Sequence, residues 1–179
     1  MTSEQMVKDK LDMYERKGLF SRDSGIKHLV GSFIAKARHN LETARVMFDM
    51  SESNSAKEAL KISSSYAAYD WAIVSAYYAM YHAALGALAS LGFKSEDHEA
   101  TRIALLYYYV LEGSLESKYV TVLGKARKLE EEYVQKLYKA KRTRQIAQYS
   151  VDGEFSKAEA KGLIDDAVGF VNRISELIK

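Results

Sequence analysis

Apolar residues recur at steps of three and four along most of this chain, which is the spacing of amphipathic helices. Between residues 26 and 50, leucine, phenylalanine and alanine alternate with charged residues in this pattern. A second clear case covers 157–178, where Ser156 and Glu159 have the spacing of a capping box before the first turn. The pattern predicts long helices and gives almost no strand signal.

Start and stop residues define the remaining elements. Glycine ends helices and serine begins them, and a cluster of serines favours a loop. The predicted elements are a helix over 2–17 that ends before Gly18, a helix over 98–113 with Ser95 as its N-cap residue, a helix over 118–149, and a loop with at most a short helical turn over 51–65.

The segment "WAIVSAYYAMYHAALGALASLGF", residues 71–93, contains no aspartate, glutamate, lysine or arginine. It is long enough to cross a bilayer, so a membrane span, an aromatic ligand pocket and a buried bundle helix are the three interpretations to weigh. Its tyrosines and His82 lie at the midpoint, whereas tyrosines of real spans gather at the two membrane interfaces. A membrane span is therefore disfavoured.

Two stripes on a helical wheel favour the bundle interior for this segment. Small side chains on one face allow a neighbouring helix to approach closely. Bulky side chains form the adjacent face, and their hydroxyl and imidazole groups need polar partners or a cleft. The small stripe is Ala72, Ala76, Ala79, Ala83, Gly86 and Ser90, and the bulky stripe is Trp71, Val74, Tyr78, Tyr81, Leu85 and Leu88.

Composition supports a helical fold. The 179 residues include no proline, a residue that breaks helix interiors, and 47% of them are hydrophobic. We find no internal repeat or domain linker, so one domain over 1–179 is expected. The predicted fold class is all-α, an up-and-down bundle of five to six helices with a long antiparallel helical hairpin.

The absence of cysteine excludes disulfides, thiolate metal sites and a cysteine nucleophile. The first residues alternate charges with hydrophobic residues and have no apolar core of a signal peptide, so a cytoplasmic protein is expected. Phosphate-binding glycine loops, HExxH and G-x-S-x-G are also absent. No pair of histidines has i,i+4 spacing, and we expect neither a metal site nor a cofactor.

Positive charge is concentrated between Lys125 and Arg144, with eight basic and three acidic residues, although the whole chain carries a formal net charge of only +2. Fixed cations with arginine among them are what phosphate binding requires. Cations are also favoured near a helix C-terminus, so a solvated basic surface is an equal alternative.

Three elements of the sequence together resemble the HEPN superfamily, and more narrowly an uncharacterised prokaryotic branch related to toxin–antitoxin HEPN proteins. They are the aromatic helix "AYYAMYHA", the turn Gly92-x-x-Ser95-x-x-His98, and the later "RTRQIAQYS". The resemblance runs from about residue 30 to 178, so 1–20 would be an extra N-terminal helix of a HEPN-like domain.

The resemblance implies an all-α domain with a long helical hairpin that is commonly a homodimer and is often encoded beside a minimal nucleotidyltransferase. Many relatives are metal-independent ribonucleases, including toxins of toxin–antitoxin pairs. Others bind nucleotides or are non-catalytic partners. The expected ligand is therefore RNA or a nucleotide, and no membrane is expected to take part.

The resemblance also assigns residues. Arg144 matches the arginine of the ribonuclease motif Arg-x(4–6)-His, but Tyr149 stands where a four-residue gap would place the histidine. Gln148 replaces the aspartate of the branch, and His98 matches the histidine of the turn. The candidate catalytic residues are thus Arg144, Tyr149 and His98, and the candidate nucleotide- or RNA-binding residues are Lys141, Arg142, Arg144, Gln148, Tyr149 and Tyr78.

This departure from the motif bears on enzymatic activity. A histidine near neutral pKa can exchange protons with ribose oxygens, whereas tyrosine, with an ordinary pKa near 10, is a poor base at neutral pH. The sequence leaves three interpretations open: a binding protein without efficient cleavage, an active metal-independent endoribonuclease, and a non-catalytic helical assembly module.

Overall fold

Helices form nearly all of the regular structure. The computed structural model describes residues 2–143 and 156–179, with side chains placed except at 3, 130 and 132–143. The α-helices in this part of the chain are α1 (Ser3–Arg16), α2 (Val30–Glu52), α3 (Asn54–Ala59), α4 (Tyr69–Ser90), α5 (His98–Leu105), α6 (Ser117–Thr143) and α7 (Lys157–Leu177). A 3-10 helix, Ser24–Leu29, precedes α2, and a π-helical turn, Leu106–Val110, follows α5.

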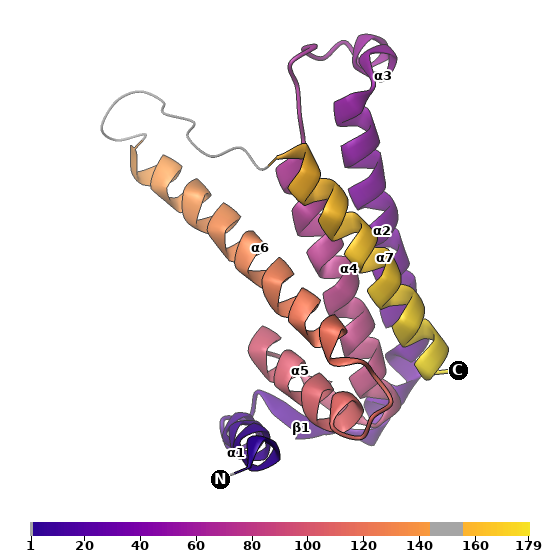
Figure 1. Ribbon diagram of the computed structural model, residues 1–179, viewed down its shortest axis with the longest axis vertical. Coiled ribbons are helices and arrows are strands. Elements are labelled where there is room, and N and C mark those ends of the chain that lie inside the picture. Colours follow the sequence, from indigo (N-terminus) through magenta and orange to yellow (C-terminus); the bar gives the residue numbers. More distant parts are fainter. Residues whose placement is uncertain (1, 144–155) are drawn as a thin grey trace.

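The four long helices run alternately up and down, with α4 in the middle of the bundle (Figure 1). Helices α2 and α4 are antiparallel partners, α7 packs on both of them, and α6 leaves the bundle toward its C-terminal end (Figure 1). The predicted all-α bundle with a long antiparallel hairpin is confirmed. The short helix α3 lies within the predicted loop 51–65, for which at most a short helical turn was expected.

Helix α4 forms the core of the bundle because small side chains let its neighbours approach. Ala72, Ala76, Ala79 and Ala83 are all fully buried. A side chain at Gly86 would meet Ile34 of α2, because an added Cβ would lie 3.1 Å from the Ile34 Cδ1 atom. The stripe of small residues therefore sets the α2–α4 contact.

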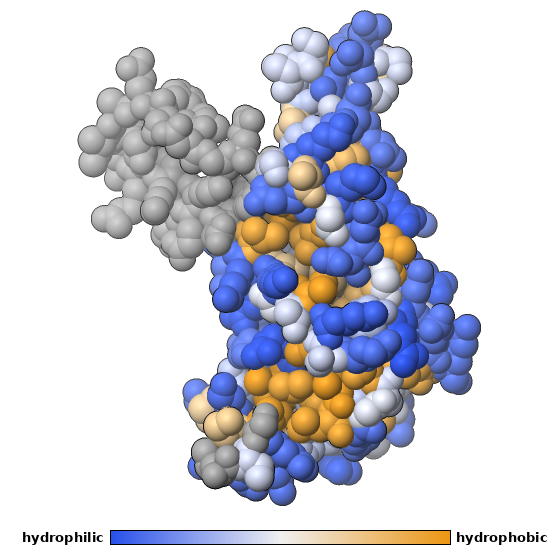
Figure 2. Space-filling model, viewed as in Figure 1, coloured by the Kyte–Doolittle hydropathy of each residue, from blue (hydrophilic) through white to orange (hydrophobic). Residues whose placement is uncertain are grey.

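Helix α4 lies in the core of the bundle. By length and composition alone, α4 is the one helix among the described residues that could cross a bilayer, but 72% of its most apolar window is buried within the protein. Polar side chains cover much of the molecular surface, and apolar side chains gather between α6 and α7 and over α5 and the following turn (Figure 2).

The close contact at Gly86 gives a stability prediction. A Gly86→Leu substitution would overfill the α2–α4 contact, and we expect it to lower the free energy of unfolding by about 1–3 kcal/mol. Gly162 of α7 is a matched control, because nothing lies within 4 Å of its added Cβ. Gly162→Leu is expected to be neutral or stabilising, since leucine favours helix over glycine. Urea denaturation of both variants measures the difference, and equal losses at the two sites would contradict the proposed contact.

A small antiparallel sheet is the feature that the sequence pattern missed. Strands β1 (Phe20–Arg22) and β2 (Phe93–Ser95) pair through three residues each. The rings of Phe20 and Phe93 stack with centroids 5.0 Å apart, and Tyr108 stacks on Phe93 at 4.5 Å. Three residues are too few to show the alternation by which a strand is recognised.

The predicted N-cap of α5 is wrong by two residues. Ser95 lies in β2, and the N-cap residue is Asp97, whose carboxylate accepts hydrogen bonds from the backbone N–H groups of Glu99 and Ala100 at 2.9 and 2.8 Å. The predicted capping box of α7 is confirmed, because Ser156 and Glu159 bond each other's backbone N–H groups. As the N-cap residue, Asp97 also fixes the backbone position of His98, the first residue of α5.

Candidate functional site

A half-exposed face of α4 carries Tyr78 and, three and four residues after it, Tyr81 and His82. The neighbouring Tyr77 points inward and is 1% exposed. His98, the first residue of α5, is also half-buried and meets this face. We call these five residues the tyrosine–histidine cluster.

Three tyrosines hold the ring of His98. Tyr81 stacks on it with centroids 4.1 Å apart and planes 12° from parallel, and Tyr78 presents an edge at 6.3 Å. The His98 Nδ1 atom is hydrogen-bonded to the hydroxyl of Tyr77. Since Asp97 anchors the backbone beside it, the imidazole is fixed in both position and orientation.

His82 is oriented by the backbone of its own helix. Its Nδ1 atom lies 2.7 Å from the carbonyl oxygen of Tyr78 and 3.0 Å from Nδ2 of Asn40 on α2. One nitrogen cannot both donate to the carbonyl and accept from the amide. The carbonyl can only accept and gives the shorter contact, so we place the proton on Nδ1. In the neutral imidazole, Nε2 then carries the lone pair.

Burial keeps both imidazoles of the cluster neutral near pH 7. The pKa of His98 is lowered by burial first and then by the charge of Arg127, against the opposing charges of Asp97 and Glu131. The pKa of His82 is likewise lowered, mainly by burial, while its bond to the Tyr78 carbonyl opposes the shift. Burial also raises the pKa of Tyr81, so its hydroxyl stays protonated.

Charged residues of α5 and α6 border the cluster. Arg127 of α6 is 2.8 Å from Glu131 through Nε and 3.4 Å from Glu99 through Nη1. Glu99 is paired more tightly with Arg102, whose Nε donates at 2.9 Å. Arg127 therefore makes the longer of the two contacts with Glu99. Its positive charge also acts to lower the pKa values of His98 and Tyr81.

The lowered histidine pKa values make stability depend on pH. A histidine with a lowered pKa in the folded state takes up a proton first in the unfolded chain. We therefore expect the free energy of unfolding to fall as pH drops below about 6.5 and to level off below the folded-state pKa. A His98→Asn variant should show a shallower loss between pH 7.5 and 5. Denaturation at a series of pH values measures it, and stability that rises on acidification through this window would contradict the assignment.

Of the residues predicted for the site, Tyr78 and His98 are brought together in the cluster. Lys141 and Arg142 lie in the last turns of α6, where the backbone is described and the side chains are not. Arg144, Gln148 and Tyr149 lie outside the described residues. Five cluster residues or neighbours were not predicted as site residues: Tyr77, Tyr81, His82, Asn40 and Arg127.

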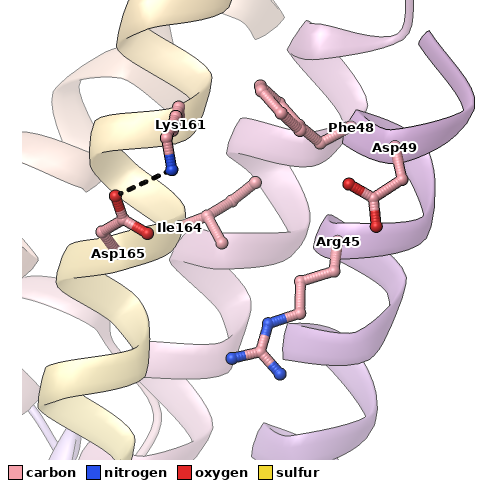
Figure 3. A pocket seen from close by; sticks show the side chains of 6 residues that line it. All are labelled: Arg45, Phe48, Asp49, Lys161, Ile164 and Asp165. Atoms are coloured by element: carbon pink, nitrogen blue, oxygen red, sulfur yellow. Dashed lines mark hydrogen bonds and ion pairs between the residues drawn. The ribbon is translucent and has the colours of Figure 1, made fainter. Parts of the chain in front are cut away.

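No metal centre is found in the described part of the chain, where no three histidine, aspartate or glutamate residues group as ligands. A separate groove of about 260 Å³ lies between α2 and α7 (Figure 3). It is lined by Arg45, Phe48, Asp49, Lys161, Ile164 and Asp165. Both charge signs are balanced there, and Lys161 pairs with Asp165 at 3.4 Å, so this groove has no evident preference for an anionic ligand.

Comparison with protein families matches residues 51–177 to the HEPN domain. This match covers α3 to α7 and includes every cluster residue. A curated protein of Methanocaldococcus jannaschii, named "Putative toxin MJ0605", is 25% identical over 163 residues, which are 91% of this chain and 97% of that protein. The predicted relationship to HEPN proteins is thereby confirmed.

Proposed function

This chain belongs to the HEPN domain family, and from that premise we propose that it binds RNA or nucleotides through the tyrosine–histidine cluster. The protein would act as a toxin–antitoxin component or as a partner of a minimal nucleotidyltransferase. The observation that carries the proposal is the half-exposed set of Tyr78, Tyr81 and His98, with His98 stacked 4.1 Å from Tyr81.

Aromatic and imidazole rings are the surfaces on which unpaired bases stack. Tyr78 and Tyr81 meet edge to face at 6.4 Å, so they present two differently oriented ring surfaces on one helix face. Stacking contributes about 1–3 kcal/mol per base and tolerates any sequence. A neutral imidazole beside the rings can also exchange hydrogen bonds with a base edge.

The basic part of α6 would supply the electrostatic component. It leads from Arg127, beside the cluster, to Lys141 and Arg142, and the sequence continues with Arg144. On the family resemblance, Arg144, Gln148 and Tyr149 would contact the phosphate and base. The toxin name of the Methanocaldococcus protein supports the same class of function.

Salt dependence tests this proposal. Each phosphate contact releases counterions, so affinity for a short single-stranded RNA should fall linearly with salt on logarithmic axes. A Lys141→Glu/Arg142→Glu variant should bind more weakly and with a shallower slope. The matched control, Arg45→Glu/Lys161→Glu, changes the same charge at the α2–α7 groove and should bind like the wild type. Fluorescence anisotropy measures both quantities. Failure of the wild type to bind RNA or nucleotide at any salt would contradict the proposal and favour a helical assembly module.

We also propose a homodimer, as the family resemblance implies. Light scattering at micromolar concentration should give the mass of two chains, about twice 20.2 kDa. A mass equal to one chain would contradict this part of the proposal.

A metal-independent endoribonuclease is the second candidate function. It is favoured by the half-exposed His98, because an imidazole with an ordinary pKa near neutrality that is lowered mainly by burial can take part in proton transfer. Total RNA incubated with the protein should then be cut equally with and without EDTA, leaving 2′,3′-cyclic phosphate ends. Cleavage unchanged by Arg144→Ala would contradict the role assigned to that arginine by the family motif.

A further inference from the structure

We propose that His82 is a catalytic partner of His98, so that the two histidines form the acid–base pair of an RNA-cleaving site that does not depend on a histidine at position 149. This inference rests on the proposed function, because it requires RNA to lie over the tyrosine–histidine cluster. It assigns a residue that the family motif does not include.

The two histidines are 16 positions apart in the sequence and lie on different helices, but they meet on the same pair of rings. Tyr81 lies 4.1 Å from His98 and 5.9 Å from His82, measured between ring centroids. Tyr78 lies 6.3 Å from His98 and 6.1 Å from His82. All four rings are partly exposed. A nucleotide lying over the exposed parts of the two tyrosines would therefore be near both imidazoles.

In both His82 and His98 the hydrogen bonds described above involve Nδ1, so Nε2 is the nitrogen that would transfer protons. Nδ1 of His82 donates to the Tyr78 carbonyl at 2.7 Å, which places the lone pair of the neutral ring on Nε2. Nδ1 of His98 is bonded to the Tyr77 hydroxyl. Each ring is thus held in place through Nδ1. A histidine that transfers protons through Nε2 needs such a fixed orientation.

The reaction balances with these two groups alone. Nε2 of His82 accepts the proton of a ribose 2′-hydroxyl while the 2′-oxygen attacks the adjacent phosphorus. The bond from phosphorus to the 5′-oxygen breaks, and the protonated His98 gives its proton to that oxygen. The products are a 2′,3′-cyclic phosphate and a 5′-hydroxyl, with no further reactant.

The surroundings of the pair fix the direction of the pH dependence. His82 faces Asn40 and the cation Lys36 of α2, and a positive charge on His98 would also lower its pKa. His98 faces Asp97 of its own turn and, from α6, Arg127 and Glu131. One ring must be neutral and the other protonated, and burial lowers the pKa of both. We therefore expect a bell-shaped rate profile with its optimum on the acid side of the ordinary histidine pKa of about 6.5.

Asparagine substitutions separate catalysis from structure. The amide of His82→Asn can still donate to the Tyr78 carbonyl in place of Nδ1 but has no group at Nε2, and His98→Asn likewise keeps a partner for Tyr77. His39→Asn on the exposed surface of α2 is the matched control. Cleavage and affinity are measured for the same RNA in EDTA, under single turnover and across pH, with circular dichroism confirming that each variant folds.

We expect each variant of the pair to cleave about 10²–10⁴-fold more slowly and to lose one limb of the pH profile, with affinity largely kept. The double variant should be little slower than either single one, because the residues act as a unit. His82→Asn cleaving like the wild type would overturn the inference. So would a wild type that binds RNA without cutting it, which would leave the proposed binding function intact. Absence of binding would instead contradict the proposed function itself.

Discussion

Phe170→Ala is expected to lower the free energy of unfolding by about 3–5 kcal/mol, the largest effect of any single substitution considered. Phe170 of α7 is fully buried, and its ring meets Tyr119 of α6 edge to face at 6.0 Å. Removing it would leave a cavity where α7 packs on the bundle. The positions before and after it on the same face, Ala167, Val171 and Ile174, are also buried and cannot relax into solvent.

Urea denaturation measures this loss, and Val46→Ala is the control. Val46 is 60% exposed on α2, so its truncation should change stability by no more than about 0.5 kcal/mol. If Phe170→Ala and Val46→Ala had similar effects, α7 would not pack as described. The outcome bears on function because α7 packs on α4, the helix that carries four of the five cluster residues.

The second large effect is expected on RNA affinity. A Tyr78→Leu/Tyr81→Leu variant removes both stacking surfaces while keeping apolar volume. Each stacked base contributes about 1–3 kcal/mol, so we expect affinity to fall by about 10²–10⁴-fold for the pair. The two single variants need not add, because the rings touch each other.

Tyr107→Leu is the control for this substitution. Tyr107 is a half-buried tyrosine of the turn after α5 and packs against Tyr108, outside the cluster. Anisotropy titrations of one labelled RNA should show near wild-type affinity for Tyr107→Leu and a large loss for the cluster variant. Equal losses would mean that lost tyrosine packing, rather than base stacking, weakens binding.

The sequence predicted the helices well, because each long helix has a strong local signal. The capping box at Ser156 and the small-residue stripe from Ala72 to Gly86 both depend on neighbours within a few positions. The sheet was missed for the opposite reason. Its strands are three residues long and pair across more than 70 positions, so no local pattern marks them. Ser95 was predicted as an N-cap because the sequence near it does not indicate its pairing with Phe20.

The site was predicted only in part, for the same physical reason. Tyr78 and His98 were marked by the family resemblance. The contact between Asn40 and His82 spans 42 positions, and the hydrogen bond between Tyr77 and His98 spans 21. Arg127 was visible in the sequence only as one of eight cations in a basic stretch. Its place beside His98 follows from the packing of α6 on α4 and α5, which periodicity does not reveal.

The most direct test of the central claim is a titration with a short single-stranded RNA in which NMR follows the ring signals of the histidines. The four histidines give four sets of ring signals. His82 and His98 belong to the cluster, whereas His28 and His39 lie on the exposed surface. We expect the His82 and His98 signals to shift with RNA in a saturable way, while those of His28 and His39 stay in place. Saturable binding that left the His82 and His98 signals unmoved would contradict the tyrosine–histidine cluster as the binding site.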